Sequence, residues 1–222
     1  MKLVLFPGGG NPDTDLYSKV YGLLVKRAPA FGYSAVDTSV RWPGHVILPG
    51  EGDDVLTFQG ALAVAKTTLA GHEGVGEPYD ILARSFGTYI ALKATMETTL
   101  QHLRRVILWG APPFWHMWQM FVRDLEETKD TARAKGILVD KSLFPSLHAI
   151  ESLLQETPRK VIVVTGTDDK FSTPAFHSYL MQITAGARRD IVFRPPVKGA
   201  PHEVTAELSR EVVDNYLDQV LG

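Results

Sequence analysis

Three short segments of the chain carry, in this order, a nucleophile, an acid and a base. The segment 83–87 (ARSFG) holds a serine, 166–169 (GTDD) holds two carboxylates, and 199–202 (GAPH) holds a histidine. A serine hydroxyl is a poor nucleophile unless a base lies within hydrogen-bond reach and a third group orients that base. The three segments together therefore predict nucleophilic acyl chemistry, in which Ser85 attacks and His202 serves as its base.

The sequence around Ser85 is typical of a tight turn between a strand and a helix. A strand-like run precedes it at 79–83, and a helix-like run follows at 88–98. Ala83 and Gly87 are small, as they must be where a larger side chain would collide with the neighbouring strand or helix. This is the nucleophile-elbow arrangement. A second interpretation stays open, because serine is a favoured N-cap residue and would then only begin the helix.

The order Ser, Asp, His is the order in which α/β-hydrolases carry their catalytic triad. With the elbow at Ser85 and the strand-end residues Asp169 and His202 after it, the chain resembles a compact α/β-hydrolase. The motif departs from the family pattern G-x-S-x-G at its first glycine, where Ala83 stands. The resemblance implies a carboxylesterase-like serine hydrolase that needs no metal and no organic cofactor. Thioesterases, amidases, C–C hydrolases and acyl transferases share these residues, and a non-catalytic ligand-binding protein of the same shape is the alternative from another class.

Apolar runs typical of strands alternate with helical patterns along most of the chain. We expect strands at 3–6, 34–40, 80–83, 105–109, 160–165 and 190–194, and helices at 15–27, 54–69, 88–100, 174–185 and 206–220. Most of the strand runs are continuously hydrophobic, which suits strands covered on both faces. The alternation predicts an α/β fold, a three-layer sandwich in which a mostly parallel sheet of about six strands carries helices on both faces. The expected chain order is 2-1-3-4-5-6, without the opening antiparallel strands of the resembled family.

One segment, at about 112–157, breaks the alternation. It contains helix-like stretches near 115–133 and 144–155 with no strand between them. In the resembled family, an insertion after the strand that corresponds to 105–109 forms a cap over the active site. We therefore expect a single α/β-hydrolase-like domain over 1–222 with a helical cap at about 112–157. The alternative is an ordinary pair of surface helices that pack on the domain.

The resemblance also chooses among the candidate bases and acids. Of the seven histidines, His202 alone follows the last expected strand, where the family keeps its histidine. The alternative is that His202 merely begins the final helix. Asp169 stands three residues after Gly166 and five before Pro174, the spacing of the acid in the resembled family. Asp168 then becomes a turn or rim residue, although both carboxylates remain candidates.

An acyl-transfer site also needs N–H donors aimed at the oxygen that gains charge. Phe86 follows the serine, so its amide is the first candidate for the oxyanion hole. Matching the Pro-Gly of the glycine-rich loop to the His-Gly of the family pattern places the second donor at Gly9, with Gly8 or Gly10 as alternatives. A dinucleotide-phosphate site is the rival interpretation of this loop, but Asp13 stands where its third glycine is expected.

Three further residues are candidates for contact with the substrate. Arg84 neighbours the nucleophile and would pair with an anionic group of the substrate if it faces the pocket. Alternatively, it points into loop carbonyls or toward an acidic partner. Trp115 and Trp118 are candidate pocket-lining residues, although aromatic stripes are more often packing. Together with a cap, these aromatic residues indicate a modest, mostly apolar pocket.

The composition argues against several other classes of protein. The 222 residues are 45% hydrophobic and carry a formal charge of −2, which gives no basic surface for nucleic acid. The absence of cysteine removes disulfides and cysteine-ligated metals, and the histidines lack metal-ligand spacing. The sequence shows no signal peptide and no apolar stretch of membrane-span length. We therefore expect a cytoplasmic protein with a small-molecule acyl substrate and no metal, cofactor, nucleic acid or membrane span. No pattern in the sequence specifies the length of the acyl chain or the oligomeric state.

Overall fold

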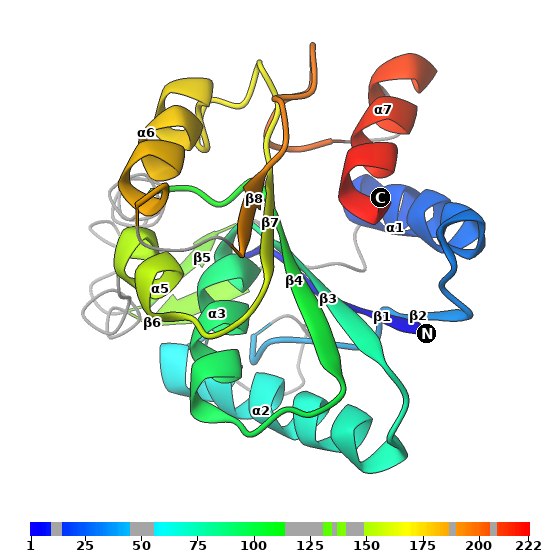
Figure 1. Cartoon of the computed structure of the whole chain (residues 1–222), viewed down its shortest axis with the longest axis vertical. Coiled ribbons are helices and arrows are strands. Elements are labelled where there is room, and N and C mark those ends of the chain that lie inside the picture. The colour runs from blue at the N-terminus through cyan, green and yellow to red at the C-terminus, as the bar shows by residue number, and fades with distance from the viewer. Residues whose placement is uncertain are drawn as a thin grey trace.

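The sheet of this computed structural model consists of six parallel strands (Figure 1). The structure describes residues 1–9, 15–44, 56–113, 131–134, 137–140, 149–186, 190–204 and 208–222. In the order β2-β1-β3-β4-β7-β8, the strands are Ala35–Asp37, Lys2–Phe6, Tyr79–Arg84, Leu103–Trp109, Val161–Val164 and Ile191–Phe193. Every neighbouring pair is parallel. The predicted α/β class and the predicted strand order are therefore confirmed.

Helices cover both faces of the sheet, which makes three layers (Figure 1). One face carries α1 (Asp15–Arg27), the 3₁₀ helix η1 (Ala28–Phe31) and α7 (Arg210–Leu221), and the other carries α2 (Phe58–Val75), α3 (Phe86–Glu97), α5 (Ile150–Glu156) and α6 (Pro174–Thr184). The helices expected at 15–27, 54–69, 88–100, 174–185 and 206–220 are present as α1, α2, α3, α6 and α7. The largest shift of a helix end is at α2, which continues to Val75, past the expected end at 69.

The apolar side chains of the strands alternate between two buried clusters. Val4 and Phe6 of β1 belong to the cluster that includes α2 and α3, whereas Leu3 and Leu5 belong to the cluster that includes α1 and α7. This alternation follows from the two-residue period of a strand. Because both faces are covered, the strands have nearly continuous apolar sequences.

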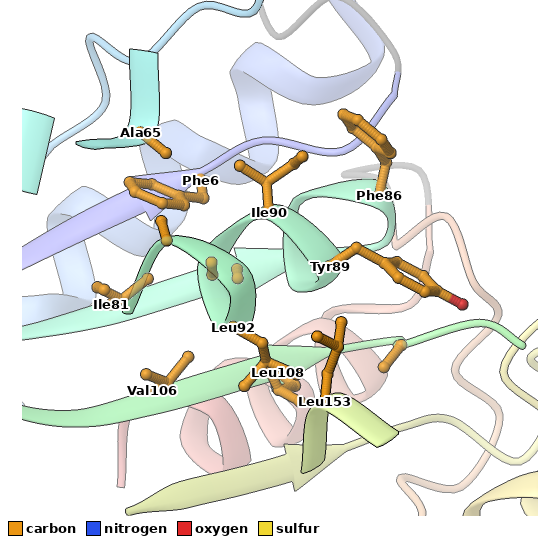
Figure 2. Close-up of a cluster of buried hydrophobic side chains, with 14 of the residues drawn as sticks. Phe6, Ala65, Ile81, Phe86, Tyr89, Ile90, Leu92, Val106, Leu108 and Leu153 are labelled. Carbon is orange, nitrogen blue, oxygen red and sulfur yellow. The ribbon is translucent and has the colours of Figure 1, made fainter. Parts of the chain in front are cut away.

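The helix that follows Ser85 is buried along most of its length. Figure 2 shows Ile90 and Leu92 of α3 in one cluster with strand residues such as Val106 and Leu108. Helices α2 and α5 contact α3 on the same face of the sheet. This packing fixes the first turn of α3 and therefore the serine at its start.

The segment at 112–157 differs from the prediction. Thr131–Ala134 (β5) and Ile137–Asp140 (β6) pair as a two-stranded antiparallel sheet, so the expectation of a helix as far as 133, with no strand in this segment, is wrong. The pairing with β6 overrides the helical propensity of Thr131–Ala134, because strand formation depends on the partner strand as well as on local preference. The second expected helix is confirmed in its described part by α5. Residues 114–130, 135–136 and 141–148 lie outside the described residues, and the cap stays a prediction.

Candidate active site

Ser85 lies at the tip of a sharp turn between β3 and α3. Its backbone angles are φ 48° and ψ −118°, and no other non-glycine residue in the described part of the chain has a positive φ. Such a conformation costs on the order of 1–3 kcal/mol and persists only where the surroundings enforce it. Although Ser85 occupies the N-cap position of α3, its hydroxyl makes no capping hydrogen bond. The capping interpretation therefore does not hold, and the turn has the geometry of an elbow.

The elbow is held by the strands on either side of it. The backbone N–H of Ser85 donates to the carbonyl of Trp109 in β4 at 3.0 Å, and the N–H of Thr88 donates to the carbonyl of Ser85 at 3.0 Å. A Cβ atom at Gly87 would lie 2.4 Å from the carbonyl oxygen of Pro7, at the end of β1. Only glycine fits so close a contact, which is why a small residue is needed after the serine.

Three side chains from distant parts of the sequence meet at this turn. Nε2 of His202 lies 3.0 Å from Oγ of Ser85, and Nδ1 of His202 lies 3.0 Å and 3.1 Å from the carboxylate oxygens of Asp169. The exposed fractions of Ser85, His202 and Asp169 are 7%, 6% and 2%. Because an ionised carboxylate only accepts, Nδ1 carries the proton and Nε2 is left to accept from the serine hydroxyl. The three side chains stand in the relation that base-assisted attack by a serine requires.

Asp169 is oriented by the turn that carries it. Its Oδ1 accepts from the backbone N–H of Phe171 at 2.8 Å and from that of Ser172 at 2.7 Å. Asp168 is exposed, and its Oδ1 accepts from the hydroxyl of Thr167 at 2.9 Å. Of the two candidate carboxylates, Asp169 is therefore the one that contacts the imidazole, while Asp168 lies at the rim of the turn.

Solved structures with the same architecture identify the fold. The chain matches no protein-family model and no curated protein. It is similar to the esterase domain of a Rhodothermus marinus protein (TM-score 0.66, 19% identity, 99% of this chain and 84% of that chain covered). It is similar also to a monoacylglycerol lipase from Paleococcus ferrophilus (TM-score 0.64, 17% identity, 99% and 93% covered) and to the mouse alpha/beta hydrolase domain-containing protein 10 (TM-score 0.58, 14% identity, 99% and 87% covered). The chain has the α/β-hydrolase fold.

Within this α/β-hydrolase fold, the glycine-rich loop after β1 lies against the elbow. A Cβ atom at Gly8 would lie 3.3 Å from Cβ of Ser85. Gly9 follows directly, whereas Gly10 lies outside the described residues. Phe86 begins α3, where the first N–H groups have no partner within the helix. The two elements expected to supply oxyanion donors are thus adjacent at Ser85, and the assignment of Gly9 and Phe86 as those donors stays a prediction.

Arg84 is buried beside the elbow. Its exposed fraction is 3%, and its Nη2 donates to the carbonyl oxygen of His202 at 3.4 Å. Its guanidinium carbon lies 5.4 Å from the centre of the Trp109 ring. These contacts match the alternative in which Arg84 points into loop carbonyls, and its contact with a substrate stays a prediction. The other two candidate substrate contacts, Trp115 and Trp118, lie outside the described residues.

Sequence reasoning missed two neighbours of the imidazole. Gly110, directly after β4, has a φ of 60°, and a Cβ atom there would lie 3.2 Å from Nδ1 of His202 and 3.3 Å from Oδ2 of Asp169. The ring of Phe171 meets the imidazole edge-on, with 5.0 Å between ring centres. A glycine that ends a strand next to the elbow strand is a signal that points to Gly110. Phe171 has no comparable signal in the sequence.

Several charged side chains of the described residues form ion pairs. Lys66 and Lys93 both contact Glu97, for example. Across the described ranges, no group of three or more His, Asp or Glu side chains is arranged to hold a metal ion. None of the helices in that part of the chain has the length and apolar character of a bilayer-crossing segment.

His177, in α6, is a buried histidine away from the elbow. Its ring lies edge-on to Phe193 of β8, with 5.1 Å between ring centres. Burial lowers the pKa of His177 below its ordinary value, and a hydrogen bond with the backbone of Arg194 offsets only part of the shift. At His177, the folded protein therefore binds less proton than the unfolded chain as the pH falls through about 6.5.

We expect the free energy of unfolding to fall as the pH is lowered from about 7 to about 5, and His177→Phe to make this fall shallower. The unfolded histidine takes up its proton near pH 6.5, whereas the buried one does so only at lower pH, so stability present above 6.5 is lost toward acid. Urea unfolding of both proteins at a series of pH values measures the difference. Parallel curves for the two proteins would show that His177 does not contribute.

Proposed function

We propose that the protein is a serine hydrolase that cleaves a carboxylic ester, or a related acyl bond, of a small molecule. The observation that carries the proposal is the buried chain of contacts from Asp169 through His202 to Ser85, with 3.0 Å between the nearest atoms of each pair. The similar solved structures include an esterase domain and a monoacylglycerol lipase, whose names support the same class of reaction.

In the first half-reaction, Oγ of Ser85 attacks the carbonyl carbon of the ester while Nε2 of His202 takes the hydroxyl proton. The carbonyl oxygen becomes an oxyanion, to which the amides of Phe86 and Gly9 donate. When the tetrahedral intermediate collapses, the bond to the alcohol breaks and the imidazolium of His202 protonates the leaving oxygen. The acyl group then remains on Ser85.

In the second half-reaction, water replaces the alcohol. His202 takes a proton from the attacking water, the same amides hold the second oxyanion, and Ser85 leaves with the proton that His202 returns. In both halves a positive charge forms on an imidazole whose exposed fraction is 6%. The carboxylate of Asp169, 3.0 Å from Nδ1, compensates that charge where water is scarce.

The same contacts would serve thioesters, amides and acyl transfer, so the bond that is cleaved is tested with substrates. We expect p-nitrophenyl acetate to give a burst of p-nitrophenolate that approaches the enzyme concentration when deacylation is much slower than acylation. A panel that holds the acyl group constant and changes the leaving group from alcohol to thiol to amine then ranks kcat/KM. Binding of these compounds without turnover of any would instead indicate a ligand-binding protein.

Replacing Gly110 with alanine is expected to lower kcat by roughly 10-fold, because the imidazole must shift by a small fraction of the roughly 1 Å displacement that costs about 100-fold. The new Cβ would press on both Nδ1 of His202 and Oδ2 of Asp169. Steady-state hydrolysis of p-nitrophenyl acetate measures kcat, and thermal unfolding measures stability.

Gly76→Ala is the matched control for this change. Gly76 also has a positive φ, of 76°, but the nearest atom to an added Cβ, Nε2 of His102, is 3.9 Å away. Both variants carry the backbone strain of a left-handed alanine, about 1–2 kcal/mol. If both lose stability and only Gly110→Ala loses kcat, the effect comes from the imidazole contact; equal values of kcat would contradict it.

A further inference from the structure

Trp42 lies in the segment between β2 and α2 and contacts both elements that are expected to supply the oxyanion donors, the loop after β1 and the start of α3. Its exposed fraction is 1%. Its Nε1 donates to the carbonyl oxygen of Pro7 at 3.0 Å. The indole meets the ring of Phe6 edge-on, with 5.6 Å between ring centres, and the ring of Phe86 edge-on, with 6.3 Å. One side chain therefore touches the glycine-rich loop and the residue that follows Ser85.

The hydrogen bond from Trp42 fixes the orientation of the Pro7–Gly8 peptide. The proline ring sets φ of Pro7, but the direction of its carbonyl depends on ψ, which the ring leaves free. The glycines that follow would tolerate several orientations of the peptide planes. Because the C=O and N–H of a trans peptide point in opposite directions, holding the Pro7 carbonyl also directs the N–H of Gly8 and sets the start of the Gly8–Gly9 peptide.

The segment that carries Trp42 is itself held in place. Nη1 of Arg41 donates to the carbonyls of Thr38 at 2.6 Å and Val40 at 2.9 Å, which closes the turn after β2. On the other side, Cγ of Pro43 would lie 3.0 Å from a Cβ atom at Gly60, in the first turn of α2. These contacts restrain the backbone on both sides of Trp42.

We propose that Trp42 is a positioning residue for the oxyanion hole. Its N–H sets the loop that offers the Gly9 amide, while its ring supports Phe86, which offers the other amide. This inference rests on the proposed serine hydrolase function and extends it to a side chain that touches neither the substrate nor the triad. The consequence is that removing one N–H group, with no change of shape, slows acyl transfer.

The test replaces a single atom. Trp42→3-benzothienylalanine, introduced by nonsense suppression, keeps the bicyclic ring but has sulfur in place of the N–H. We expect kcat for p-nitrophenyl acetate, and the rate of labelling by a fluorophosphonate, to fall roughly 10- to 100-fold. This loss is smaller than the roughly 10²- to 10³-fold loss of kcat that follows when an oxyanion donor is removed outright. KM stays close to that of the unmodified protein, since the packing is kept, whereas the unfolding temperature falls because the buried carbonyl of Pro7 loses its donor.

Tyr33→Phe provides the matched control. Tyr33 is also fully buried, and its hydroxyl donates to Oδ2 of Asp80 at 2.7 Å, near the start of β3 and away from Ser85 at its end. Phenylalanine keeps the ring and removes this donor, so stability falls while kcat is expected to change by less than twofold. If the suppressed protein is not recovered folded, Trp42→Phe, which also lacks the N–H, takes its place beside Tyr33→Phe.

The outcomes separate this inference from the proposed function. A slower reaction in the Trp42 protein alone, with KM unchanged and measured well below the unfolding temperature, supports the positioning role. A Trp42 protein that reacts as fast as the unmodified one, while the unmodified protein labels at Ser85, overturns the positioning role and leaves the hydrolase intact. An unmodified protein that neither labels nor turns over overturns both.

Discussion

Replacing Ser85 with alanine is expected to lower kcat by about 10⁶-fold, the effect of losing a triad nucleophile. Alanine has no oxygen to attack the acyl carbon, so His202 loses the proton it would transfer. The residual rate would come from the oxyanion donors and from substrate binding. Stability should not fall, because the Ser85 hydroxyl contacts the imidazole and makes no capping bond to α3.

The measurement is steady-state hydrolysis of p-nitrophenyl acetate beside thermal unfolding. Ser178→Ala is the matched control, since Ser178 is exposed on α6 and donates to the carbonyl of Pro174 at 2.9 Å. We expect this variant to keep the kcat of the unmodified protein. Substantial turnover by Ser85→Ala, at more than about a hundredth of the original rate, would rule out a covalent role for Ser85.

Replacing Asp169 with asparagine is expected to lower kcat by about 10⁴-fold while the fold is kept. Oδ1 of Asp169 accepts from two backbone N–H groups, so the asparagine oxygen takes that place and its NH₂ faces the imidazole. Nδ1 of His202 must then accept, which moves the ring proton to Nε2. A protonated Nε2 cannot take the proton of Ser85. The variant therefore keeps its nucleophile but loses its base.

Asp80→Asn is the matched control for a buried carboxylate. Asp80, in β3, accepts from the hydroxyl of Tyr33 at 2.7 Å and from Nε of Arg105 at 2.7 Å. Replacing the Asp80 carboxylate with an amide should lower the free energy of unfolding by about 1–3 kcal/mol, since a charged hydrogen-bond partner is removed. kcat should be retained. If Asp169→Asn behaves in the same way, with lower stability and normal kcat, Asp169 has only a structural role.

The arrangement of the sheet could be predicted because its causes are local. Runs such as Val161–Val164 are apolar at every position, which marks strands covered on both faces. Right-handed crossovers then leave few orders for such strands. Ser85 could be placed because small residues flank it between a strand and a helix, and the resemblance to α/β-hydrolases placed His202 in the loop after the last strand. Both follow strands of one parallel sheet, whose carboxyl ends lie at one edge.

The remaining features depend on contacts that no local pattern records. The pairing of β5 with β6 overrides the helical propensity of Thr131–Ala134, and such overrides are set by the partner strand. The hydrogen bond from Trp42 to Pro7 joins residues 35 positions apart, and a lone tryptophan in a loop predicts no partner. Arg84 neighbours the nucleophile in sequence, yet its side chain lies over Trp109 in β4.

The most direct test of the hydrolase mechanism is the intact mass of the protein after exposure to a fluorophosphonate, measured for the unmodified chain and for Ser85→Ala. A phosphonate reacts with a serine whose proton is taken by a base, and the adduct mimics the tetrahedral intermediate. The mechanism predicts one adduct on the unmodified protein, mapped to Ser85, and none on the variant. No adduct on either protein, or the same adduct on both, would contradict it.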